Sequence, residues 1–123
     1  MEGMIPMLFI CYPKCGTCRK AKKLLETHGI SFAERNIKLD PPSADEITEW
    51  IKKTGLPSKK FFNTSGMAYK NAGIKDKIEA MSEDEKIEIL ASDGMLVKRP
   101  ILIADGLILI GFKQEEWENK LKK

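Results

Sequence analysis

The chain is poor in several residue types that define other classes of protein. It has one histidine and no apolar run near the roughly 20 residues that a membrane-spanning helix needs. Its first residues lack the basic segment and apolar stretch of a signal peptide. We therefore expect a soluble, cytoplasmic protein that has no membrane partner.

Cysteine is also scarce and confined to one place. The three cysteines, Cys11, Cys15 and Cys18, lie within eight residues of one another. An odd number of cysteines crowded at one end excludes the disulfide framework of a small secreted domain. No second group of cysteine or histidine completes a zinc site, so we expect no metal. The pattern favours a reducing compartment, with one reactive pair and one spare thiol.

The overall charge and length set further limits. A net charge of +3 over 123 residues is too small and too dispersed to predict direct binding to nucleic acid. This length suits one domain, 1–123, that buries its own core without disulfides. We expect a monomer.

The first third of the chain predicts a βαβ unit. Residues 5–12 are apolar enough for a buried strand, residues 18–28 have the apolar spacing of an amphipathic helix, and residues 31–37 form a second strand. Gly29 ends the helix. A strand, a helix and a strand within about 30 residues predict two parallel strands.

The middle of the chain, about 41–95, predicts a helical insert. Ser43 and Ser82 are each followed three residues later by a glutamate, which is the sequence signature of a capping box. Gly55 ends the first of these helices, and Asp93 with Gly94 ends the second.

The last part predicts a ββα unit: a strand at 101–104, a hairpin turn at Asp105-Gly106, a strand at 107–112 and a helix at 114–121. The whole order gives an α/β, thioredoxin-like (glutaredoxin-like) fold, with a four-stranded mixed sheet and a helical insertion between its halves. In that fold Arg99-Pro100, which opens the third strand, is the candidate for a cis peptide bond facing the thiols.

Cys15 and Cys18 form a CxxC motif that follows a strand and opens a helix. Unpaired N–H groups and the helix dipole at such a position stabilise a thiolate, which is the reactive form of cysteine. Lys14 and Arg19 add positive charge. We predict that Cys15 attacks a substrate and that Cys18 then resolves the product by forming the Cys15–Cys18 disulfide.

For the other candidate residues, a structural role is a better interpretation than a catalytic or metal-binding one. The spacing C-x3-C-x2-C also occurs at iron–sulfur sites, but Cys11 lies inside a strand and the chain is too short for such enzymes. Cys11 is therefore predicted to be a buried apolar bystander. His28, near the end of the helix, is expected to interact with the helix dipole. The neighbouring lysines form a solvated face or attract acidic substrates.

Five segments together resemble the arsenate reductase (ArsC)-like family, which includes Spx-type regulators. The segments are 12–21, 55–57, 61–66, 96–101 and 111–112. The resemblance implies that Cys15 is the nucleophile of an arsenate reductase. It also implies an oxyanion-binding set, which is Gly16, Thr17, Arg19, Arg99 and Pro100.

Two departures from the arsenate-reducing members bear on the substrate. Asn63 and the stretch 107–110 stand where those members place further arginines, and such arginines supply bidentate oxyanion contacts. Cys18 is a second cysteine that those members often lack. Both departures favour dithiol redox chemistry.

We therefore predict an ArsC-like thiol–disulfide oxidoreductase acting on a small oxyanion or a disulfide. It would bind no cofactor and would use glutathione, thioredoxin or glutaredoxin as reductant. The resemblance to Spx-type regulators leaves an alternative open, in which the CxxC pair is a redox switch on a transcriptional regulator that binds RNA polymerase.

Overall fold

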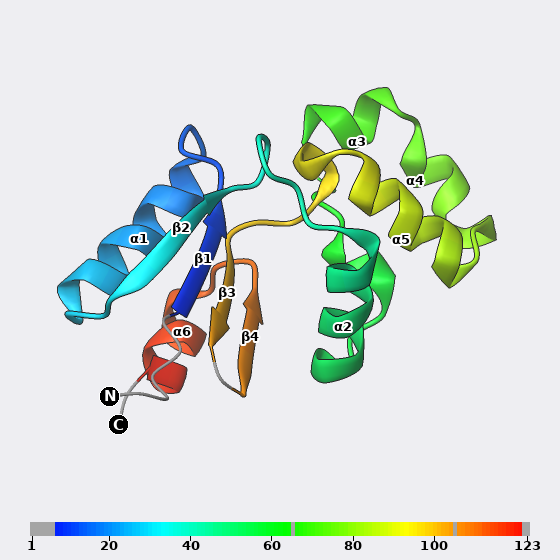
Figure 1. The fold of residues 1–123 in the computed structure, drawn as a ribbon. Helices are drawn as coiled ribbons and strands as arrows, with labels where there is room; N and C mark the ends of the chain where they lie inside the picture. The colour runs from blue at the N-terminus through cyan, green and yellow to red at the C-terminus, as the bar shows by residue number, and fades with distance from the viewer. Residues whose placement is uncertain (1–6, 65, 105, 122–123) are drawn as a thin grey trace. The chain divides into compact units, whose positions relative to one another are not determined.

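The computed structural model describes residues 7–64, 66–104 and 106–121 (Figure 1). It divides into two compact units, one made of the residues up to 36 and from 99 onward, the other of residues 37–98. The predicted helical insert, 41–95, falls inside the second unit. The assignment of the whole chain to one domain stays a prediction. No helix in the described ranges has the length and apolar character that crossing a membrane requires.

A four-stranded mixed sheet forms the first unit. Its strands are β1 (Met7–Cys11), β2 (Phe32–Asn36), β3 (Ile101–Ala104) and β4 (Leu107–Ile110), in the order β2-β1-β3-β4. β1 and β2 are parallel, as predicted from the βαβ pattern, and the other neighbours are antiparallel. The predicted hairpin turn includes position 105, which lies outside the described residues.

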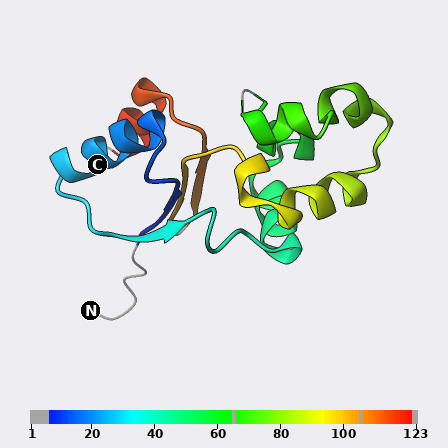
Figure 2. The ribbon, with the colours of Figure 1, turned by 90° about the horizontal axis from the view of Figure 1, so that it is seen from above.

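Two helices cover one face of this sheet, α1 (Gly16–Thr27) and α6 (Gln114–Leu121). Figure 2 shows both on the same side of the strands. Phe9, Leu102 and Leu109 lie opposite one another on neighbouring strands and are buried in one cluster beneath the helices. Because side chains alternate along a strand, this register forms one apolar face. The thioredoxin-like α/β fold is therefore confirmed.

Trp117 of α6 connects the core to the start of β3. It is fully buried and packs edge-on against Phe9 and Phe112, with ring centroids 6.4 and 5.1 Å away. Its indole N–H donates to the carbonyl of Gly111 at 3.0 Å. The N–H of Gly111 in turn donates to the carbonyl of Pro100 at 2.8 Å. A short chain of hydrogen bonds thus ties the core to the Arg99-Pro100 segment.

The second unit consists of helices and short turns. In chain order they are α2 (Ala44–Thr54), η1 (Ser58–Phe61), α3 (Met67–Asn71), α4 (Ile74–Lys77), η2 (Ile78–Ala80), α5 (Glu83–Ser92) and η3 (Gly94–Leu96).

Both predicted capping boxes are present, at α2 and α5. The hydroxyls of Ser43 and Ser82 each accept from a backbone N–H at 3.1 Å, and the glutamates reach back to the serine N–H groups. Gly55 ends α2 in the left-handed conformation, with φ 72°. These helix ends were therefore predicted correctly from capping residues that lie within one turn of each end.

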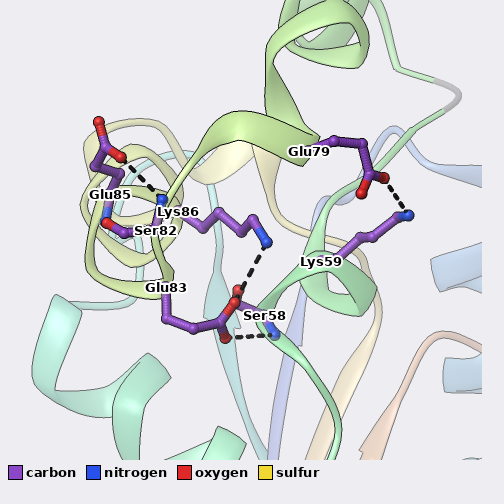
Figure 3. A network of polar contacts seen from close by, with 7 residues as sticks. All are labelled: Ser58, Lys59, Glu79, Ser82, Glu83, Glu85 and Lys86. Carbon is purple, nitrogen blue, oxygen red and sulfur yellow. Dashed lines mark hydrogen bonds and ion pairs between the residues drawn. The ribbon is translucent and has the colours of Figure 1, made fainter.

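A polar network holds η1, η2 and α5 together (Figure 3). The Ser58 N–H donates to the Glu83 carboxylate at 3.3 Å, and Lys86 pairs with the same carboxylate at 3.3 Å. Lys59 pairs with Glu79 at 2.6 Å. Hydrogen bonding from Ser58 holds the pKa of Glu83 below its usual value, because it stabilises the charged form. The short helices of this unit are therefore joined by side-chain contacts between elements far apart in sequence.

Candidate active site

Cys15 lies at the start of α1, as the sequence predicts. It is the N-cap residue, with φ −88° and ψ 124°. Its N–H donates to the carbonyl of Tyr12 at 2.9 Å, and its carbonyl accepts from the N–H of Arg19 at 3.1 Å. The helix begins at Gly16, two residues earlier than the predicted start at 18. The whole CxxC motif therefore belongs to the helix entry, and Cys15 is half-buried.

The helix start is open, and its own first turn carries no negative side chain. Its first turn has no acidic residue, and Cys15 makes no side-chain capping hydrogen bond. A Cβ built on Gly16 would meet nothing within 4 Å. Lys14 and Arg19 are exposed on either side. This environment leaves backbone N–H groups and the positive end of the helix dipole available to a thiolate or a bound anion.

Cys18 lies three residues further along the chain, still in the first turn of α1, in a different environment. It is 2% exposed, and its Sγ accepts a hydrogen bond from the Tyr12 N–H at 3.3 Å. Contact with Cys11, together with burial, raises the pKa of the Cys18 thiol. The pair is therefore asymmetric in exposure, which fits the predicted attacker and resolver. Those two roles stay predictions.

Cys11 is the last residue of β1 and is 4% exposed, so its expected burial in a strand is confirmed. The sequence analysis missed that its thiol contacts Cys18, a contact that lowers the pKa of Cys11. Both sulfurs line one cavity of about 260 Å³, together with side chains of the loop, α1 and β2; these are Pro13, Arg19, Lys22 and Glu34. Cys11 therefore packs against a thiol as well as against apolar side chains, because the last residue of β1 and the first turn of α1 lie side by side. Its role as a bystander stays a prediction.

Two arginines predicted for oxyanion binding contact the segment 12–15, which we call the Cys-loop, from positions far apart in sequence. Arg19 donates from Nε to the carbonyl of Pro13 at 3.1 Å and so closes the loop on itself. The guanidinium carbon of Arg99 lies 5.5 Å from the centroid of the Tyr12 ring, a cation–π contact. The Arg99–Pro100 bond is cis, as predicted, and Pro100 is buried. The structure thus brings residue 99 beside the start of the Cys-loop.

Tyr12 is a functional candidate that the sequence analysis did not single out. Its N–H contacts Cys18, its carbonyl accepts from Cys15 and its ring lies under Arg99. One residue therefore contacts the Cys18 thiol, the backbone N–H of Cys15 and one predicted oxyanion ligand. The only available signal was an aromatic residue immediately before Pro13.

Of the remaining candidates, Gly16 and Thr17 lie at the helix start, and the others lie elsewhere or have other partners. Gly16 and Thr17 are exposed in the first turn of α1, where the prediction needs them. His28 is exposed at the opposite end of that helix. Lys22 forms an ion pair with Glu34 of β2 at 2.9 Å, so it is not simply solvated. Asn63 belongs to the second unit.

In the described ranges, no group of side chains is arranged to bind a metal ion. Within 7–64, 66–104 and 106–121, no three or more histidine, cysteine, aspartate or glutamate side chains are grouped so that they could hold a metal ion.

A thioredoxin-like fold with a CxxC motif at the first turn of α1 defines the class of protein. Residues 11–120 match the ArsC family over nearly the whole chain. The chain belongs to the ArsC family.

Curated relatives fall into two groups. The uncharacterized protein YusI of Bacillus subtilis is 52% identical over 112 residues, which cover 91% of this chain and 95% of YusI. The regulatory protein MgsR of the same organism is 31% identical over 117 residues, 95% of this chain and 91% of MgsR. The family therefore includes at least one protein described as a regulator.

Solved structures of similar proteins share the fold over nearly the full length. A Bacteroides fragilis protein described as related to the ArsC family superposes with a TM-score of 0.91 at 48% identity, covering 97% of this chain and 99% of that one. A Streptococcus mutans protein described as a possible arsenate reductase superposes with a TM-score of 0.82 at 45% identity, covering 91% and 97%.

Proposed function

We propose that this protein is a thiol–disulfide oxidoreductase in which Cys15 is the nucleophile and Cys18 the resolving thiol. One observation carries the proposal: a half-buried thiol stands at an open helix N-terminus without acidic neighbours in that turn, and a shielded thiol lies in the same turn. Such an arrangement favours attack by the first sulfur and intramolecular resolution by the second. We place the reaction in the reducing environment of the cytoplasm.

The reaction consists of two thiol–disulfide exchanges. The Cys15 thiolate attacks one sulfur of a substrate disulfide, the substrate S–S bond breaks, and one substrate thiolate leaves. Cys18 then loses its proton and attacks Cys15 Sγ, which releases the second substrate thiolate and leaves a Cys15–Cys18 disulfide. The raised pKa of Cys18 keeps this thiol protonated until that step, so a departing thiolate is the natural proton acceptor. Glutathione, thioredoxin or glutaredoxin then reduces the chain.

Arsenate is the oxyanion we propose as a second kind of substrate. The Cys15 sulfur would displace water from arsenic, and attack by a second thiol on that sulfur would release arsenite and form a disulfide. The helix N-terminus, Arg19 and Arg99 supply positive charge on the side of the loop. The description of the Streptococcus mutans structure supports this substrate. The absent arginines at Asn63 and 107–110 argue for weaker oxyanion binding than a dedicated reductase would have.

The test is turnover by the purified protein of arsenate, with glutathione, glutaredoxin or thioredoxin as reductant, and of glutathione disulfide, with thioredoxin as reductant. Cys15→Ser should bring both activities down to the uncatalysed background, because the other two thiols are buried. Cys18→Ser should retain part of the activity when glutathione is present, since an external thiol then resolves the intermediate.

His28→Ala is the matched control, because His28 is exposed at the far end of the same helix. It should leave turnover unchanged. Full activity in the Cys15→Ser variant would overturn the assignment of the nucleophile.

A redox-switched regulator that binds RNA polymerase is the second candidate, and the similarity to the regulatory protein MgsR favours it. Such a regulator would turn over neither substrate. Instead its binding to purified RNA polymerase, measured by interferometry, should differ between the reduced and diamide-oxidised chain. The Cys15→Ser and Cys18→Ser variants should lose that difference.

A further inference from the structure

We propose that Cys11 is a third redox thiol, which takes the disulfide from Cys15 by forming a Cys11–Cys18 bond. This inference rests on the proposed function, because it concerns what happens to the oxidised CxxC pair. In this scheme Cys18 is no longer the end point of oxidation but passes the disulfide from the half-buried Cys15 to the buried Cys11.

The backbone geometry places the Cys18 sulfur against the end of β1. The hydrogen bond to Cys18 Sγ comes from the Tyr12 N–H at 3.3 Å, and Tyr12 is bonded directly to Cys11. The Cys18 sulfur is therefore held one peptide unit from Cys11. The two side chains are 4% and 2% exposed and belong to the same buried cluster.

A cavity gives the two sulfurs room to change partners. Cys11 and Cys18 both line the space of about 260 Å³, whose wall also includes the Lys22–Glu34 ion pair. A sulfur that exchanges partners must rotate about its Cα–Cβ bond, which a close-packed core resists. The contact with Cys18 is the largest influence that lowers the pKa of Cys11, and Lys22 adds to it, while burial and the charge of Glu34 oppose it.

The proposed step conserves atoms and electrons within the chain. The Cys11 thiolate attacks Sγ of Cys18 in the Cys15–Cys18 disulfide. The Cys11–Cys18 bond forms, the Cys15–Cys18 bond breaks, and Cys15 leaves as a thiolate. The proton lost by Cys11 goes to solvent or to Cys15. No external oxidant or reductant takes part, because the step isomerises an existing disulfide.

The consequence concerns the state of Cys15 in the oxidised protein. A Cys11–Cys18 disulfide is buried, whereas Cys15 remains at the open start of α1 as a free thiol. The oxidised chain can then attack a second substrate, with glutathione resolving the mixed disulfide. Cys11 is catalytic in this scheme, because its sulfur bonds to a reacting atom.

The decisive variant is Cys15→Ser, which leaves Cys11 and Cys18 as the only thiols. Treatment with one equivalent of diamide should remove both thiols from the monomer. Trypsin cleaves after Lys14 and Arg19, so a Cys11–Cys18 bond joins peptide 1–14 to peptide 15–19. A Cys15–Cys18 bond lies within peptide 15–19 alone. Mass spectrometry therefore separates the two disulfides.

Two variants serve as controls. Cys11→Ser should form only the bond within peptide 15–19, and Cys18→Ser should keep both of its thiols in the monomer. The wild-type chain, oxidised and quenched in acid, should yield the linked peptide pair with its bond assigned to Cys18 by fragmentation. This last measurement needs no substitution, so a variant that fails to fold does not obscure the result.

The proposal is overturned if Cys15→Ser keeps two free thiols at a diamide dose that fully oxidises Cys11→Ser. It is also overturned if the linked peptides occur only in a disulfide-bonded dimer. Neither measurement depends on turnover. An inactive wild-type enzyme would therefore count against the proposed function alone, and an unreactive Cys11 against the relay alone.

Discussion

Three cysteines within eight residues of sequence have three different environments in the fold. Cys15 is half-buried at the helix start, Cys18 is shielded inside the first turn, and Cys11 is enclosed at the end of a strand. The chemical differences among them arise from exposure and contacts, because all three belong to one residue type. Residue spacing alone therefore does not assign their roles.

The contact with Cys11 gives a prediction for the reactivity of Cys18. Only the thiolate is alkylated, and both the contact and burial raise the pKa of Cys18. In the Cys15→Ser variant, labelling of Cys18 by iodoacetamide should therefore be slow at neutral pH. Its rate should rise with pH through a midpoint above the ordinary cysteine value. Peptide mass spectrometry of timed samples measures this rate.

Replacing Cys11 by alanine in the same background should move that midpoint downward, because the contact is the largest cause of the raised pKa. The midpoint is the diagnostic quantity, since a cavity left by the substitution would speed labelling equally at every pH. An unchanged midpoint would show that Cys11 does not influence Cys18.

The sequence predicted the position of Cys15 and the burial of Cys11, but it missed the Cys11–Cys18 contact. The first two follow from local patterns, a CxxC motif before an amphipathic helix and a thiol in an apolar strand. The contact depends on how tightly the chain turns between Cys11 and Gly16. The position of the Arg99 guanidinium over Tyr12 depends likewise on the pairing of β1 with β3, residues far apart in sequence.

At the scale of elements, the helix starts are of two kinds. α2 and α5 begin with capping boxes, whereas α1 begins at Cys15 without a side-chain cap. A serine cap satisfies an N–H group that would otherwise have no partner in the helix. The uncapped start therefore leaves donors of α1 available to an anion, at some cost in stability.

This contrast predicts that removing a serine cap lowers the free energy of unfolding and that introducing one raises it. Ser43→Ala and Ser82→Ala should each lower the free energy of unfolding by about 1 kcal/mol, because each removes a cap. Cys15→Ser should raise it, by roughly 0.5 kcal/mol, since it places a favourable capping residue at an extended N-cap position. Urea unfolding followed by circular dichroism measures all three.

Ser92→Ala is a useful control for the alanine variants, because Ser92 is exposed at the last position of α5 rather than at its cap. It should change the unfolding free energy by less than either cap variant. A destabilised, well-folded Cys15→Ser chain would contradict the view that the start of α1 is optimised for chemistry over stability.

Local signals predicted the elements well and their lengths less well. The helices at 44–54, 83–92 and 114–121 and the strand at 101–104 lie where capping residues, glycines and apolar patterns placed them. The last strand was predicted to 112 but ends at Ile110, because Gly111 turns with φ 75°. The sequence also predicts shorter helical pieces within 58–81, broken at Gly66 and Gly73, and these are present as η1, α3, α4 and η2. Their exact bounds depend on contacts such as Ser58 with Glu83, which join residues distant in sequence.

At the scale of the whole molecule, the thiols are confined to one unit. All three cysteines, Arg19 and Arg99 belong to the first unit, and residues 37–98 contain no cysteine. The order of strands explains this, because β3 returns from the far end of the sequence to lie beside β1. The helical insert therefore separates the site's parts in sequence without contributing a thiol.

Oxidation should accordingly alter hydrogen exchange in the first unit and leave residues 37–98 unchanged. A disulfide at Cys18 replaces a thiol that accepts from the Tyr12 N–H, so the amides of the Cys-loop and the first turn of α1 should change most. Exchange measured by mass spectrometry on the reduced and diamide-oxidised protein tests this, with the Cys15→Ser, Cys18→Ser double variant as the insensitive control. Equal changes in 37–98 would contradict the prediction. They would mean that the thiols control the insert, which a redox-switched regulator requires and an oxidoreductase does not.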